Sequence, residues 1–72
     1  MKVYLLTDVI LDLRSHRETE TTTGVFASLP RAQAAVPSVS DWRSMYGGVA
    51  WKGIDPSTHA AWWLITEWEV RV

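Results

Sequence analysis

The sequence contains no cysteine and no long apolar run. Without cysteine neither disulfides nor thiolate metal sites can form, and this composition suits a reducing compartment. The longest uninterrupted apolar run extends only from Ala60 to Ile65, whereas a membrane-spanning helix needs about 20 residues. The N-terminus enters a pattern that is interrupted at Asp8, and it does not resemble a signal peptide. We therefore expect a cytoplasmic protein without a membrane partner.

The sequence also lacks an excess of charge of either sign. Seven basic and eight acidic residues give a formal net charge of −1, and the basic residues are scattered singly or interleaved with acids. Nucleic-acid binders usually carry a concentrated basic patch. Nucleic-acid binding is therefore disfavoured, including the mode in which bases stack on aromatic side chains.

The length predicts one domain, residues 1–72, close to the lower limit for folding without a covalent or metal support. A chain of this size buries roughly 60% of the surface that its unfolded form exposes. Its core rarely contributes more than about 3–5 kcal/mol of net stability. The supports that remain are oligomerisation and dense aromatic packing, and the five tryptophans are compatible with both.

Two segments, residues 3–13 and 61–72, alternate with a period of two, which is typical of half-buried strands. One face of each is almost uniformly apolar, so we expect these two faces to form one buried surface, with Trp68 in the core. The residues of this predicted core face are Val3, Leu5, Thr7, Val9, Leu11, Leu13, Trp62, Leu64, Thr66, Trp68, Val70 and Val72.

The opposite face of the same two segments is half apolar. Its apolar members are Tyr4, Leu6, Ile10, Trp63 and Ile65. A single helix covers only one face of a sheet, so this second face needs another cover. Three covers are compatible with the pattern: a protein partner, a second copy in a two-fold homodimer, or the chain's own segment 42–54 folded back.

A threonine-rich segment and a short helix are predicted between the two alternating segments. Residues 18–26 favour an edge strand, in which Gly24 marks a bulge or a close approach. Ser28 is a typical helix N-cap, and Pro30 is tolerated in the first turn. Because the residue before Pro37 avoids helical geometry, we expect the helix to end at about Ala35.

Residues 42–54 fit either a small hairpin about Gly47 and Gly48 or an ordered loop, and 55–58 have the composition of a turn. The predicted fold is α+β: a small antiparallel sheet of three to four strands with one short helix packed on one face. The first strand is expected in the centre, antiparallel to both others.

The segment Gly24-Val-Phe-Ala-Ser-Leu-Pro-Arg-Ala32 resembles a motif in small, functionally uncharacterised phage and bacterial proteins. Such proteins begin with a strand similar to residues 2–6 and end with one similar to residues 65–67. The resemblance implies a β-β-α-β layout and a phage or actinobacterial setting, with the host cytoplasm as the location of a phage-encoded protein, and it implies no activity. The tryptophan-rich stretch 42–51 has no counterpart in that pattern.

Catalytic and metal-binding chemistry finds little support. Asp8 and Asp12 would lie about 13 Å apart along a strand, beyond the roughly 5–9.5 Å of a glycosidase pair. Glu67 and Glu69, about 7 Å apart, satisfy that distance, but a solvated strand face is the more common reason for such a pair. His16 and a second histidine, at position 59, do not assemble the three or four ligands of a metal site. We expect no catalytic residue, no metal and no cofactor.

Binding residues are predicted in and beside the tryptophan-rich stretch. Tryptophan, tyrosine and arginine are enriched at binding hot spots, which favours Trp42, Arg43, Tyr46 and Trp63 as partner-binding residues, with Trp51 as a buried anchor. The expected function is a non-enzymatic protein–protein interaction module: a phage-related inhibitor of a host or defence protein, or a homodimeric module. The alternative is a small-ligand binder or minor enzyme, with a pocket between residues 42–54 and the sheet that uses Glu67, Glu69 or the histidine at 59.

Overall fold

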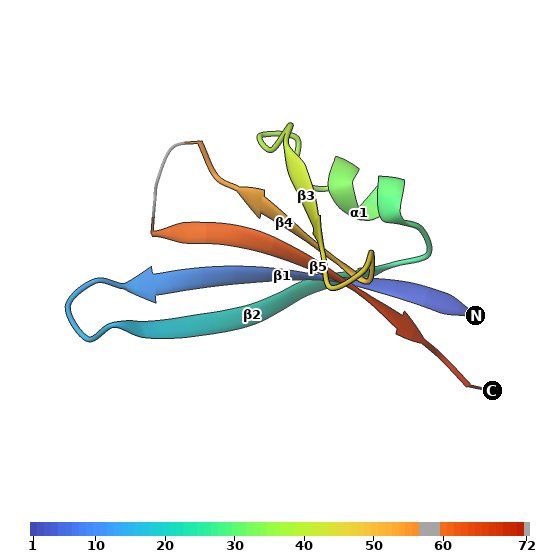
Figure 1. The fold of residues 1–72 in the computed structure, drawn as a ribbon, viewed down its shortest axis with the longest axis horizontal. Helices are drawn as coiled ribbons and strands as arrows, with labels where there is room; N and C mark the ends of the chain where they lie inside the picture. The colour runs from blue at the N-terminus through green and yellow to red at the C-terminus, as the bar shows by residue number, and fades with distance from the viewer. Residues whose placement is uncertain (57–59, 72) are drawn as a thin grey trace.

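The computed structural model describes residues 1–56 and 60–71. It contains a single antiparallel sheet of five strands in the order β2-β1-β5-β4-β3, together with one helix (Figure 1). The elements are β1 (Lys2–Asp12), β2 (Arg17–Phe26), α1 (Leu29–Ala34), β3 (Trp42–Met45), β4 (Ala50–Ile54) and β5 (Ala61–Glu69).

The prediction of an α+β fold with three to four strands was therefore wrong, because the domain is nearly all-β. The helix has only six residues, and the segment whose conformation was left open forms two further strands, β3 and β4. The turn between them passes through Tyr46, Gly47 and Gly48 with φ values of 54°, 73° and 93°. Glycine adopts such values without steric cost, which is why a hairpin forms here.

The antiparallel pairing of β1 on both sides agrees with the prediction, but its expected place in the centre of the sheet does not. β1 pairs antiparallel with β2 on one side and with β5 on the other, and Leu6 lies directly opposite Ile65. The middle strand of the whole sheet is β5, because β4 pairs with its other edge. At the far end β1 and β2 form a long arm (Figure 1), whose turn is closed by the Asp12 carboxylate accepting from the Arg14 amide at 2.9 Å.

The edge strand β2 contains the predicted bulge. Its register against β1 shifts between Leu6 and Thr7, and the Thr23 hydroxyl donates to the Leu6 carbonyl at 3.2 Å. Gly24 lies beside this irregularity. A Cβ atom there would lie 2.9 Å from the Phe26 ring, so the residue also permits a close approach.

The helix begins as predicted. Ser28 is the N-cap, and its side chain accepts from the Arg31 amide at 3.3 Å. Pro30 occupies the first turn, where its missing amide hydrogen has no cost, and the helix ends with Ala35 as its C-cap. So short a helix depends on tertiary packing, which β1, β2 and β5 provide.

The core lies on the face of the sheet that was not expected to hold it. Its buried residues are Leu6, Ala32, Val36, Val39 and Ile65, with Tyr4, Phe26, Leu29, Trp42, Trp51 and Trp63 packed against them. Leu6 and Ile65 point to the side on which α1 lies, which we call the helix face. The side chains predicted as core point to the other side, where Val9 is buried as predicted but Trp68 is 56% exposed. Its assignment to the core was wrong.

The core was assigned to the wrong face because alternation shows which side chains share a face but does not show which face receives the helix. The register does place the members of the predicted set that lie in β1 and β5 on one common face, since Val9 lies opposite Trp62 and Thr7 opposite Leu64. Of the predicted set, Val72 lies outside the described residues. The 42–54 segment does not fold back over either face but extends the sheet, and it is α1 with residues 36–39 that covers the helix face.

Candidate interaction surface

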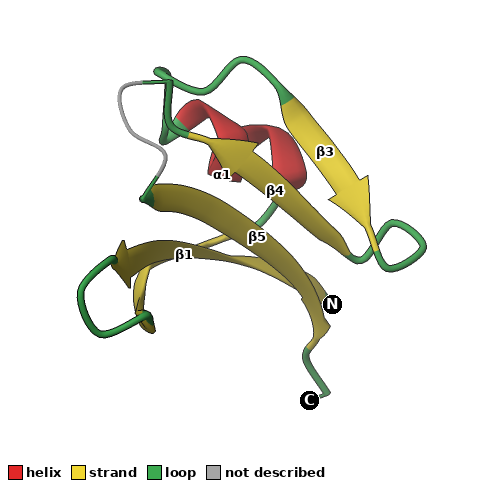
Figure 2. Cartoon of the chain, turned by 60° about the vertical axis from the view of Figure 1, so that its left-hand side comes forward, coloured by secondary structure: helices red, strands yellow, loops and turns green. Residues whose placement is uncertain are grey.

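The side of the sheet opposite α1 is the largest uncovered feature of the described structure. We call it the open face. In Figure 2 α1 lies behind β4, and within residues 1–56 and 60–71 no helix or strand lies over the open face. Its side chains are Val3, Leu5, Thr7, Val9 and Leu11 of β1; Glu18, Glu20, Thr22 and Val25 of β2; Arg43 and Met45 of β3; Ala50, Lys52 and Ile54 of β4; and Trp62, Leu64, Thr66 and Trp68 of β5.

The middle of the open face is partly covered by its own side chains. The Lys52 ammonium lies 4.8 Å from the centroid of the Trp62 ring, a distance at which cation and ring attract one another. Val9, which the register places directly beside Trp62, is almost fully buried. The aliphatic stem of a lysine can cover apolar surface while its charge stays in water, so Lys52 shields this part of the face.

Around that middle the open face exposes large apolar side chains. Val25 is 61% exposed, Ile54 51% and Trp68 56%. They lie on three different strands, so the exposed apolar surface extends across the sheet. The Trp68 indole N–H is satisfied by the Thr66 hydroxyl at 2.8 Å, which leaves its ring as an apolar contact surface. Monomeric soluble proteins rarely expose large contiguous apolar patches.

Charges of opposite sign occupy the two margins of the open face. Glu18 and Glu20 lie on β2, at one edge of the sheet. Arg43 lies on β3, at the other edge of the sheet, and Lys52 lies beside it on β4. Asp41, just before β3, is 3.5 Å from Arg43, and the two cations together leave this margin positive. The open face is therefore apolar in the middle, acidic at one side and basic at the other.

The four predicted partner-binding residues do not form one surface. Trp42 and Trp63 lie on the helix face, partly buried and packed against the core. Arg43 is exposed on the open face, while Tyr46 lies in the β3–β4 turn and is 78% exposed. Trp51 packs against the core with its ring centroid 6.0 Å from that of Tyr4. Of the four, Arg43 and Tyr46 are exposed enough to contact a partner.

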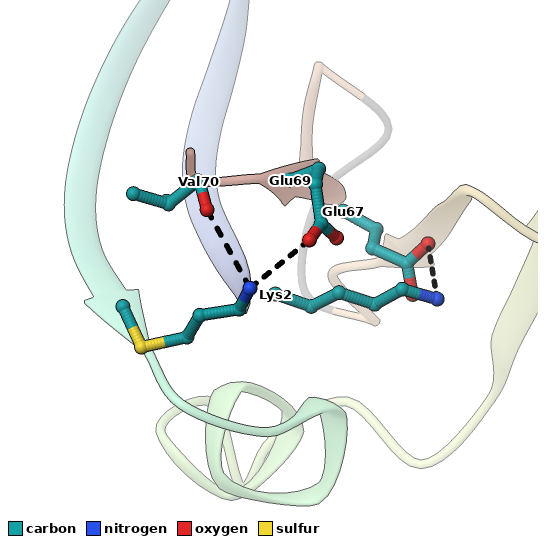
Figure 3. A network of polar contacts seen from close by, with 5 residues as sticks. Lys2, Glu67, Glu69 and Val70 are labelled. Carbon is teal, nitrogen blue, oxygen red and sulfur yellow. Dashed lines mark hydrogen bonds and ion pairs between the residues drawn. The ribbon is translucent and has the colours of Figure 1, made fainter. Parts of the chain in front are cut away.

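Glu67 and Glu69 are both engaged in contacts within the chain (Figure 3). Glu67 accepts from the Tyr4 hydroxyl at 3.0 Å and lies 3.7 Å from the Lys2 ammonium. Glu69 accepts from the N-terminal amine of Met1 at 3.0 Å. The hydrogen bond to Glu67 is the main reason why the pKa of Tyr4 is raised above 10.0. These contacts join the start of β1 to the end of β5, a structural role.

The alternative of a ligand pocket gains no support from the described residues, 1–56 and 60–71. They contain no pocket and no group of three potential metal ligands. The histidine at position 59, which that alternative invoked, lies outside them. Within the same residues, no helix has the length and apolar character needed to cross a membrane.

Sequence reasoning missed the open-face residues of β4. Lys52 and Ile54 point to the same side as Ala50, and the alternation of residues 50–54 carried that signal. It could not be used while the segment was equally compatible with a loop. The exposure of Trp68 was missed for another reason, because its face was taken as the core.

Comparison with protein-family models, with curated proteins and with solved structures found no match. The resemblance based on residues 24–32 therefore stays a prediction, and the functional argument rests on the geometry of this chain.

Proposed function

We propose that this chain is a protein–protein interaction module that binds through its open face. The observation that carries the proposal is the exposed apolar surface around the middle of that face, where Ile54 and Trp68 are more than half exposed. Aromatic anchors within an apolar patch and charges at its rim are the anatomy of protein interfaces.

Two further observations favour binding over catalysis. The carboxylates with the right spacing for acid–base chemistry are held by Tyr4, Lys2 and the N-terminal amine. The polar groups of the open face lie mainly at its margins, where they can select a partner but do not converge on a point where a substrate could react. The phage-related setting, with a host protein as target, remains part of this proposal.

The test uses a matched pair of substitutions. Ile54 and Ile10 are both 51% exposed, but Ile54 lies on the open face and Ile10 on the helix face of the arm. We expect Ile54→Glu to abolish the capture of protein partners by the immobilised chain, tested both with the soluble parent chain and with a bacterial lysate, because it places a charge within the apolar surface. Ile10→Glu should retain them. Equal capture by both variants, each shown by circular dichroism to be folded, would contradict the use of the open face.

A further inference from the structure

We propose that the occupant of the open face is a second copy of this chain, packed sheet on sheet about a two-fold axis that runs parallel to the strands. This inference rests on the proposed function and specifies its partner. Two observations carry it, the surface area of the isolated chain and the placement of charge on the open face.

The isolated chain exposes more surface than a monomer of its size. Its accessible surface is 5231 Å², whereas the scaling of folded monomers gives about 4,500 Å² for a mass of 8.2 kDa. The excess, about 700 Å², is close to the roughly 800 Å² that each partner loses in an interface of standard size. The fold offers two exposed features to account for it, the β1–β2 arm and the open face, and a two-fold pairing through the open face covers parts of both.

Charge decides how the second copy is oriented. Two face-to-face arrangements have two-fold symmetry and nearly aligned strands. With the axis across the strands, each strand faces its own copy, so the acidic margin of β2 meets the acidic margin of the other molecule. With the axis parallel to the strands, β5 faces β5, β1 faces β4 and β2 faces β3. The acidic margin then lies over the basic one, twice in each dimer.

The register brings specific side chains together in this second arrangement. Glu20 occupies the same row across the sheet as Val9, Trp62 and Ile54. Arg43 and Lys52 lie one row further along the strands, a step of about 7 Å that the long side chain of arginine can span. Glu20 of one molecule therefore meets Arg43 of the other, and Ile54 meets the apolar surface of β1.

The first measurement is the mass in solution, by sedimentation equilibrium at micromolar concentration. We expect the parent chain and Ile10→Glu to have twice the 8.2 kDa mass of one chain, and Ile54→Glu to have the mass of a single chain. A monomeric parent, or an Ile54→Glu variant that dimerises as well as the parent, would overturn the inference.

The second measurement tests the orientation by exchanging charges. Glu20→Arg and Arg43→Glu should each weaken dimerisation by about tenfold, because each places like charges opposite one another. The double variant should recover most of the parent affinity, which general misfolding cannot mimic. If the losses of dimerisation free energy in the two single variants simply add in the double variant, the strands are not arranged as proposed.

The two proposals fail in different ways. A parent chain that is monomeric but captures a different protein, with Ile54→Glu losing that capture, overturns the second copy and leaves the interaction module in place. A monomeric parent that captures nothing overturns both. Binding to vesicles of neutral and anionic lipids is measured as well. If a monomeric parent chain binds them and Ile54→Glu does not, the occupant of the open face is a lipid surface and not a second copy.

Discussion

At the scale of single residues, Gly53 shows how closely the domain is packed around its tryptophans. It is buried on β4 and pairs with both Trp42 and Trp63 in the neighbouring strands. A Cβ atom at this position would lie 2.7 Å from Cγ1 of Val39 and 2.8 Å from the ring of Trp42. Only glycine lets residues 36–39 and the Trp42 ring lie directly against the sheet.

We therefore expect Gly53→Ala to lower the free energy of unfolding by about 1–3 kcal/mol, the usual cost of overpacking a core. Thermal and urea unfolding measure it. Val39→Ala provides the control, because it removes the nearest clashing atom. In the double variant Gly53→Ala/Val39→Ala the loss should be smaller than the sum of the two single losses. Strict additivity would show that the contact is not the cause.

Tyr4 makes a pH-dependent contribution to stability. Its hydroxyl donates to Glu67, and this hydrogen bond, with burial and the nearby negative charge adding to it, raises the pKa of Tyr4 above 10.0. A raised pKa in the folded state means that the contribution is fully present below the unfolded pKa and is lost as the pH rises through the folded pKa. The relevant pH range therefore begins near 10.

The measurement is an ultraviolet titration of tyrosinate in the Tyr46→Phe background, where Tyr4 is the remaining tyrosine. We expect Glu67→Gln to lower the pKa of Tyr4, because the amide is a weaker acceptor and carries no charge. Below pH 10 the difference in unfolding free energy between this background and its Tyr4→Phe variant should be constant, and above pH 10 it should shrink. A pKa of Tyr4 that is unchanged by Glu67→Gln would contradict the assigned cause.

At the scale of elements, β5 separates two kinds of apolar side chain. Ile65 is fully buried on the helix face, where Leu6 lies opposite it, whereas Trp68 is 56% exposed on the open face. Local pattern could predict this strand, the β1 strand and the Ser28 cap, because each depends on neighbours in sequence. It could not decide between hairpin and loop for residues 42–54, because a pair of glycines suits both.

The two faces of β5 should respond differently to truncation. We expect Ile65→Ala to cost about 2–5 kcal/mol, as a large-to-small change in a core. Trp68→Ala should cost about 1 kcal/mol, because more than half of its surface is already in water. Chemical denaturation in the Ile54→Glu background measures both without a contribution from dimer contacts. A Trp68→Ala variant that is the less stable of the two would show that the open face is the true core.

At the scale of the whole molecule, the consequence of the fold is a sheet with one covered face. The helix of six residues and the segment 36–39 cover part of the helix face. Within residues 1–56 and 60–71, only Lys52 and its neighbours shield the open face. A domain of 72 residues buries a smaller fraction of its surface than a larger domain does. Burial of the open face in an interface therefore adds to the stability of the domain. Stability and assembly are linked through the same surface.

What the sequence determined by itself is local. It determined the two long strands, the edge strand with its bulge, the capped helix, and the sets of side chains that share a face, because alternation, capping and glycine geometry act over a few residues. Only the tertiary structure decided which face is covered. Both faces of β1 and β5 carry large apolar side chains, and the choice between them depends on where a short connection can carry α1. Ala32 and Val36 pack over Leu6 and Ile65, and Trp68, apolar and correctly assigned to its strand, is left facing water.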